Sequence, residues 1–149
     1  MSGYKIHILV YLISILALVF LLKNYNLLEL PMETMLLGIL IGIPYSILPD
    51  IDLPSSVMRK FLGRISIATI LVLLIAYLFL KNILLIYISI SLALFLYFLW
   101  FSRHRGFFHS ITAAILFSAP LFLIDTHIVG FALFGYLSHL TIDGKLSLF

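Results

Sequence analysis

The fold is decided by three consecutive stretches: ISIATILVLLIAYLFL at residues 65–80, KN at 81–82, and ILLIYISISLALFLYFLWF at 83–101. Neither long stretch contains a charged residue. At 1.5 Å per residue they would form helices of about 24 and 28 Å, close to the bilayer's hydrocarbon thickness of about 30 Å. The pattern therefore predicts two antiparallel membrane-spanning helices joined by a tight connection.

The rest of the chain resembles this hairpin in composition. Of its 149 residues, 64% are hydrophobic and 10% are charged, whereas soluble domains average about 25% charged residues. We expect an all-α, polytopic transmembrane bundle of about six short spans in a single domain, residues 1–149. The first run ends abruptly at Lys23 without a small-residue cleavage site, which favours a retained span over a signal peptide. The six predicted spans are Ile6–Leu22, Met32–Leu48, Ile65–Leu80, Ile83–Phe101, Ser110–Ile124 and Ile128–Ile142.

The basic residues predict the orientation of these spans. With six crossings both termini share one side of the membrane, and most basic residues fall on that side. They are Lys5, Arg59, Lys60, Arg64, Arg103, Arg105 and Lys145, against Lys23 and Lys81 on the other side. Because cytoplasmic loops carry the excess of Lys and Arg, both termini are expected in the cytoplasm and the protein in the cytoplasmic membrane. Since these residues form no dense basic run, nucleic acid is not an expected partner.

Polar residues gather in three clusters on this predicted cytoplasmic side. The first is Pro49-Asp50-Ile51-Asp52-Leu53-Pro54, the second runs from Arg103 to Ser110, and the third is His139 with Asp143. The chain contains no cysteine, which excludes disulfides, iron–sulfur clusters and thiolate zinc sites. Any metal must therefore take nitrogen and oxygen ligands.

Each cluster has a feature suited to ligation. His139 and Asp143, four residues apart, would project from one face of a helix, and Gly135, one turn earlier, would leave room beside them. Asp50 and Asp52 lie between prolines that disfavour continued helix. Gly38 and Gly42 form a GxxxG spacing that lets helices approach closely. His7 begins the first span on the same side, but nothing near it in the sequence supports it as a ligand.

Together these clusters indicate a mononuclear or binuclear site for Zn²⁺, with Mn²⁺ or Mg²⁺ as alternatives. Each cluster also has a simpler interpretation. The aspartates could end a helix in an ordinary loop, the Arg103–Arg105 segment could be interfacial charge, and His139 could hydrogen-bond Asp143 without metal.

The series Leu48-Pro49-Asp50-Ile51-Asp52, His104-Arg105-Gly106 with His109-Ser110, and Gly135 with Ser138-His139 and Asp143 resembles the YdjM-like membrane-bound metal-dependent hydrolases of bacteria and archaea. The resemblance extends from the second span to the end of the chain. It implies that these Asp and His residues are metal ligands and that the protein is a cytoplasmic-membrane hydrolase.

The leading hypothesis is metal-assisted hydrolysis of a phosphoester or similar bond in a membrane lipid or lipid-linked substrate. The expected ligands are Asp50, Asp52, His109, His139 and Asp143. His104 would be a further ligand or the general acid. Arg105 and Arg103 would bind the anionic group of the substrate.

Two other classes of function stay open. A metal or proton transporter would carry polar residues through the bilayer midplane, and the centres of these spans are almost purely apolar. A structural protein whose ion only holds the helices together would share the same ligands without catalysis. A homo-oligomer is compatible with each hypothesis.

Overall fold

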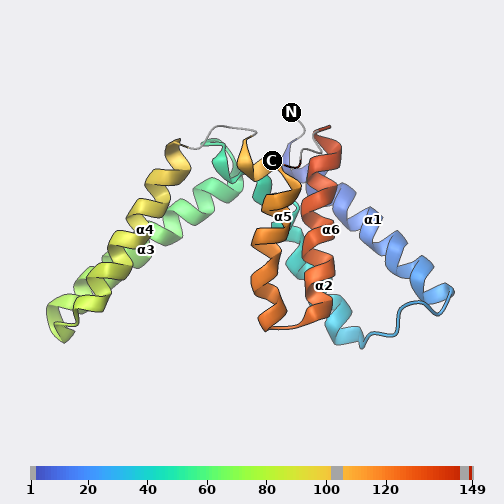
Figure 1. Cartoon of the computed structure of the whole chain (residues 1–149), viewed down its shortest axis with the longest axis horizontal. Coiled ribbons are helices and arrows are strands. Elements are labelled where there is room, and N and C mark those ends of the chain that lie inside the picture. Colours follow the sequence, from blue (N-terminus) through green and yellow to red (C-terminus); the bar gives the residue numbers. More distant parts are fainter. Residues whose placement is uncertain (1–2, 102–105, 145–147, 149) are drawn as a thin grey trace. The chain divides into compact units, whose positions relative to one another are not determined.

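The computed structural model describes residues 3–101, 106–144 and 148. Over these residues it consists of six α-helices and three short 3₁₀ helices, without a β-strand (Figure 1). The chain forms two compact units, which we describe separately. One comprises Met1–Asp50 with Arg105–Phe149, and the other comprises Ile51–His104. The all-helical fold expected from the sequence is confirmed, whereas the assignment of residues 1–149 to a single domain stays a prediction.

Helix α6 (Thr126–Ile142) is the centre of the first unit. It packs against α1 (Tyr4–Asn24), α2 (Met32–Tyr45) and α5 (Ile111–Ser118), and Figure 1 shows it beside α2 and α5. Its apolar positions recur on more than one face, so that it can bury side chains against three neighbours at once. The first unit is therefore a four-helix packing arrangement around α6.

Glycines set the close approach of α2 and α6. A Cβ atom on Gly135 of α6 would collide with the backbone carbonyl of Gly42 in α2, and one on Gly42 would collide with the Tyr11 hydroxyl. The close helix contact predicted from Gly38 and Gly42 is thus confirmed. The expectation that Gly135 leaves room beside the His139–Asp143 pair is wrong, because the backbone of α2 fills that space.

Two tyrosines, the buried Tyr11 and the half-buried Tyr45, link these helices further. The Tyr11 hydroxyl donates to the carbonyl of Ile39, 3.1 Å away, and joins α1 to α2. The Tyr45 hydroxyl donates to the carbonyl of Phe117 at 2.8 Å and joins α2 to α5. Both bonds are partly buried, and each helps to fix how one helix lies against the next.

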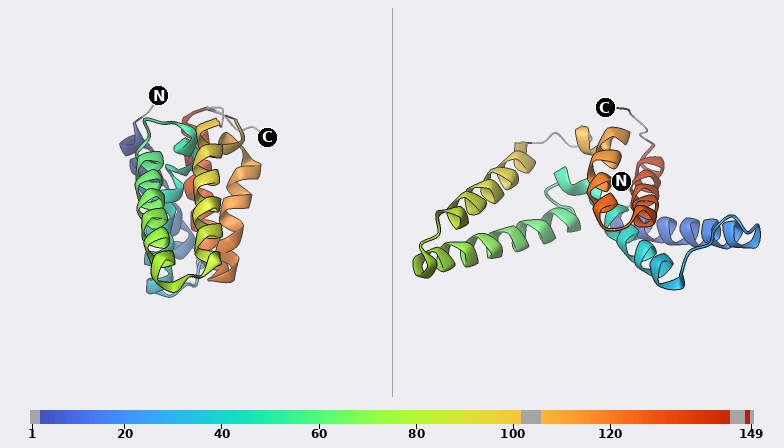
Figure 2. Two further views of the ribbon diagram at one scale, coloured as in Figure 1. Left: turned by 90° about the vertical axis from the view of Figure 1, so that its left-hand side faces the viewer. Right: turned by 60° about the horizontal axis from the view of Figure 1, so that its bottom comes forward.

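The second unit is a helical hairpin of α3 (Val57–Leu80) and α4 (Ile83–Phe101), which lie side by side in Figure 2. Lys81 adopts a left-handed conformation with φ of 51°, and the Asn82 side chain accepts a hydrogen bond from the amide of Leu84. This two-residue turn reverses the chain as the sequence predicted.

Three predicted helix bounds differ from the structure. Helix α3 begins at Val57 instead of Ile65, because Ser56 caps it by accepting from the Arg59 amide. The second span ends at Tyr45 and continues, after a turn, as the 3₁₀ helix η1 (Leu48–Asp52). The fifth divides into α5 and η3 (Ala119–Leu123), where Pro120 cannot supply an amide hydrogen.

Four helical segments are long and apolar enough to cross a membrane: Tyr4–Asn24, Met32–Asp52, Val57–Leu80 and Ile83–Phe101. The segments Ile111–Leu123 and Thr126–Ile142 are apolar but shorter. The chain is therefore built as a membrane protein with several spans. The cytoplasmic placement of its termini stays a prediction.

Candidate metal centre

Four side chains from separate parts of the chain converge at one end of the first unit. They come from η1, from the 3₁₀ helix η2 (Phe107–His109) that precedes α5, and from the last turn and C-terminal cap of α6. They are Asp50, His109, His139 and Asp143, and each offers one ligand atom within 4.8 Å of the others. Both imidazoles are fully buried, and the carboxylate side chains of Asp50 and Asp143 are only 13% and 6% exposed.

The end of α2 orients His139. The Nδ1 atom of His139 lies 2.8 Å from the backbone carbonyl oxygen of Ser46. Because a carbonyl oxygen can only accept, Nδ1 donates the hydrogen and Nε2 of the neutral ring carries the lone pair. Metal-binding histidines are typically oriented in this way, by a backbone or carboxylate acceptor on the other ring nitrogen.

The turn before α5 holds His109 in position. Ser110 caps α5 by accepting from the Ala113 amide at 3.1 Å, and its hydroxyl donates to the carbonyl of Phe107 at 2.7 Å. The buried Tyr136 hydroxyl donates to the carbonyl of Phe108 at 2.5 Å. Both carbonyls belong to η2, so that α5 and α6 together fix the segment that carries His109.

The carboxylate oxygens of the centre face the imidazole nitrogens at separations that are similar to one another. Asp50 Oδ1 lies 3.6 Å from Nε2 of His109 and 3.6 Å from Nε2 of His139. Asp143 Oδ2 lies 3.9 Å and 3.7 Å from the same two nitrogens. Hydrogen bonds from nitrogen to oxygen measure about 2.7–3.2 Å, so all four separations exceed the range of direct hydrogen bonds.

These separations are suited to a shared cation. Donor atoms about 2.0–2.2 Å from Zn²⁺ lie about 3.3–3.6 Å from each other in a tetrahedron. Among the described residues, the buried atoms Asp50 Oδ1 and His139 Nε2 have no hydrogen-bond partner. A lone pair that faces two carboxylate oxygens is repelled unless a positive charge lies between them. The residues therefore fit a divalent ion with two nitrogen and two oxygen ligands.

The structure brings a further histidine, which the sequence analysis missed, to the edge of this centre. His7 is buried, and its ring stacks on that of His139 with centroids 3.8 Å apart and planes 14° apart. Its Nε2 atom lies 3.7 Å from Oδ1 of Asp143, so that Asp143 faces His7 with one oxygen and the other imidazoles with the second. The sequence feature that could have identified His7 is its predicted position on the same side of the membrane as the three polar clusters.

Of the other predicted site residues, Asp52 is buried and belongs to the second unit. It is not among the four that converge within the described part of the chain, and its role as a ligand stays a prediction. The predicted roles of Arg103, His104 and Arg105 concern residues outside those that the structure describes. The structure does bring together one aspartate that follows the second span, Asp50, with His109, His139 and Asp143, as the sequence predicted.

The membrane helices agree with what comparison with known proteins shows. The family described as YdjM inner membrane protein matches the chain over residues 4–145. The chain belongs to this family. No curated protein and no solved structure matches it. The YdjM match covers every residue of the candidate metal centre, and it establishes a membrane protein without identifying a reaction.

Proposed function

We propose that this YdjM-family protein is a metal-dependent hydrolase that cleaves a phosphoester or related bond of a membrane lipid or lipid-linked substrate at the cytoplasmic face. The observation that carries the proposal is a set of two buried imidazoles and two largely buried carboxylates, whose nitrogen and oxygen atoms lie farther apart than hydrogen bonds allow. A divalent ion held there would lower the pKa of a water and polarise the scissile group.

The roles of the chain's own residues follow from their positions. Asp50, His109, His139 and Asp143 would hold the ion, preferably Zn²⁺, because imidazole ligands suit Zn²⁺ better than Mn²⁺ or Mg²⁺. The Ser46 carbonyl keeps Nε2 of His139 directed at the ion site. Asp52 and His104 remain candidates for further ligation, and His104 also for general acid catalysis.

Two features favour a lipid substrate over a soluble one. The centre lies at one end of helices α1, α2, α5 and α6, and helices that cross the bilayer would bring such an end to the interface with water. Arg103 and Arg105 precede His109 by a few residues and would supply guanidinium groups for an anionic headgroup. A substrate that enters from the bilayer would reach the centre without leaving the interface.

A second candidate function is a structural ion that holds the helices together without catalysis. It is favoured by the four protein ligands, because four ligands complete a tetrahedron and structural zinc sites lack an open position. Both candidates predict bound metal, so turnover separates them.

The test compares two carboxylate variants of the detergent-purified protein. Asp143→Asn removes a proposed ligand, whereas Asp125→Asn removes a charge from the other end of α6 and keeps an oxygen that can accept from the His127 amide. We expect one bound ion per chain in the wild type and in Asp125→Asn. Metal affinity should fall by about 100-fold or more in Asp143→Asn.

Phosphate release from phosphatidic acid and headgroup release from phosphatidylglycerol, both in vesicles, are then measured on the same three proteins. The hydrolase proposal requires turnover in the wild type and Asp125→Asn and its loss in Asp143→Asn. Bound metal without turnover of either lipid would favour the structural ion. Equal metal content in Asp143→Asn and the wild type would contradict the proposal that these four residues bind a metal ion.

A further inference from the structure

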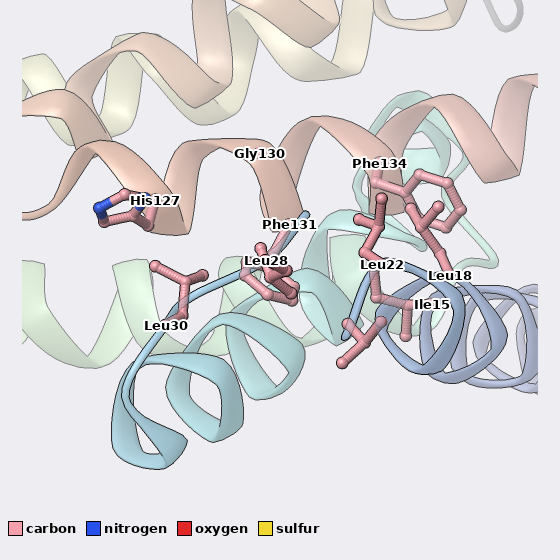
Figure 3. A pocket seen from close by; sticks show the side chains of 10 residues that line it. Ile15, Leu18, Leu22, Leu28, Leu30, His127, Gly130, Phe131 and Phe134 are labelled. Carbon is pink, nitrogen blue, oxygen red and sulfur yellow. The ribbon is translucent and has the colours of Figure 1, made fainter. Parts of the chain in front are cut away.

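An apolar groove runs along the contact of α1 and α6. Its half nearest the metal centre has a volume of about 330 Å³ and is lined by residues that include Val10, Ser14 and Thr141. Its other half, about 250 Å³, is lined by residues that include Leu18, Gly130 and His127 and is shown in Figure 3. Phe134 lines both depressions, which therefore adjoin at this residue, and we call the pair the α1–α6 groove.

The groove ends close in sequence to residues of the metal centre. On α6 its last lining residue, Ile142, directly precedes Asp143, and on α1 Val10 lies one turn beyond His7. His7 and Asp143 meet at 3.7 Å and so join the two helices where the groove stops. A ligand lying along the groove would therefore bring its end to the pair of residues that borders the proposed ion.

The chemistry of the lining determines what can fill this groove. Its walls are almost entirely hydrocarbon, and the hydroxyls of Ser14, Ser138 and Thr141 already donate to carbonyls of their own helices. Water is poorly held by such a surface, since it needs two to four polar partners. An empty groove would forfeit dispersion contacts along both helices. A hydrocarbon chain is the occupant that a surrounding bilayer supplies.

The length of the groove also suits a lipid chain. From His127 to Ile142 the helix rises about 22 Å at 1.5 Å per residue. This exceeds one leaflet, about half of a hydrocarbon core of about 30 Å. One extended acyl chain fits within it, with the headgroup at the His7–Asp143 end.

We propose that the α1–α6 groove binds one acyl chain of a phospholipid and thereby places the headgroup of that lipid at the metal centre. The proposal deepens the proposed function and rests on it for the fate of the headgroup. Lipid tails in the bilayer are as apolar as the groove. Hydrophobicity therefore does not select the acyl chain; its packing in the groove and the position of the groove beside the metal centre do.

Gly130 offers a variant that fills the groove without disturbing the helices. A Cβ atom at Gly130 meets nothing within 4 Å among the described residues, and the same holds for Gly63 in α3. Gly130→Phe would place a ring in the groove, whereas Gly63→Phe adds the same ring to the hairpin as a matched control. Ser14→Leu narrows the groove from α1 and serves if Gly130→Phe fails to fold, as judged by circular dichroism and metal content.

The probe is a phosphatidic acid with a photoreactive diazirine near the end of one acyl chain, diluted in phosphatidylcholine vesicles that contain the full-length protein. After irradiation, mass spectrometry locates the adducts. We expect them to concentrate on groove residues of α1 and α6, to fall about tenfold in Gly130→Phe and to stay unchanged in Gly63→Phe. Adducts spread equally over α3 and α4, or an unchanged yield in Gly130→Phe, would overturn the proposal.

The same samples separate this inference from the hydrolase proposal. Adducts in the groove without lipid turnover support binding of the acyl chain and contradict the hydrolase proposal. Lipid turnover that is equal in Gly130→Phe, Ser14→Leu and the wild type contradicts a role of the groove while leaving the metal centre in place.

Discussion

The α6-centred unit and the α3–α4 hairpin are both strongly apolar, yet they bury very different numbers of side chains. Helix α6 buries eight of its 17 residues, whereas α3 buries only Met58 and Ser66 among its 24. The difference follows from residue size. Glycines at positions 38, 42 and 135 allow backbones to approach closely in the first unit. Helices α3 and α4 present Leu, Ile and Phe side chains on most of their positions, which suits them to contact with lipid.

This comparison teaches that hydropathy finds membrane helices but does not distinguish those that pack from those that face lipid. Every residue of the metal centre belongs to the unit with small residues at its helix contacts. In a membrane, helices associate through close packing and polar contacts instead of the hydrophobic effect. Glycine spacing and polar residues near the span ends are therefore the better signal for a site.

The largest expected effect is that of a bulky residue at Gly135. Gly135→Leu places a side chain against the Gly42 backbone, which cannot yield as a flexible side chain would. We expect destabilisation of about 3 kcal/mol or more, with loss of monodisperse, metal-containing protein in size-exclusion chromatography. Gly63→Leu in the hairpin should behave as the wild type. If both variants purify equally well with bound metal, the packing difference between the two units is contradicted.

Metal removal is expected to have the next largest effect. An ion present at 100 times its dissociation constant stabilises the folded state by about 2.7 kcal/mol. Addition of a chelator should therefore speed amide hydrogen exchange at the site end of α6 and at η1, roughly a hundredfold, and leave α3 and α4 little changed. Exchange measured by mass spectrometry on separate peptides tests this. Equal acceleration in α4 and α6 would show that the ion does not act locally.

The smallest effect concerns a single hydroxyl. Tyr136→Phe removes the buried hydrogen bond to the Phe108 carbonyl and leaves that acceptor without this donor, which should cost about 1–2 kcal/mol. Because Phe108 adjoins His109, metal affinity should also fall. Tyr87→Phe changes an exposed hydroxyl in α4 and should alter thermal stability by less than about 0.5 kcal/mol. Identical melting curves and metal affinities for the two variants would remove the positioning role of Tyr136.

The sequence predicted the helices and most of the converging residues because their signals are local. Long uncharged runs define the spans, and the spacing of His139 and Asp143 places both on one helix face. Asp50 and His109 could be predicted only through topology, since an even number of crossings returns the chain to the same membrane side. Their convergence in one pocket depended on the close contact of α2 and α6, which Gly38 and Gly42 indicated.

What could not be predicted depends on tertiary contacts. His7 has no polar neighbour in the sequence, and its proximity to Asp143 exists only because α1 packs against α6. The early start of α3 was missed because Arg59, Lys60 and Arg64 interrupt the apolar pattern, although Ser56 supplies a cap. Gly135 was assigned to an open space because the sequence does not show which backbone lies opposite it.

The hydrogen bond between Ser46 and His139 has a mechanical consequence. The end of α2 determines the direction of one imidazole on α6. A few residues later, the same segment supplies the carboxylate of Asp50 to the metal centre. A slide of α2 along α6 would therefore rotate one donor and displace another simultaneously.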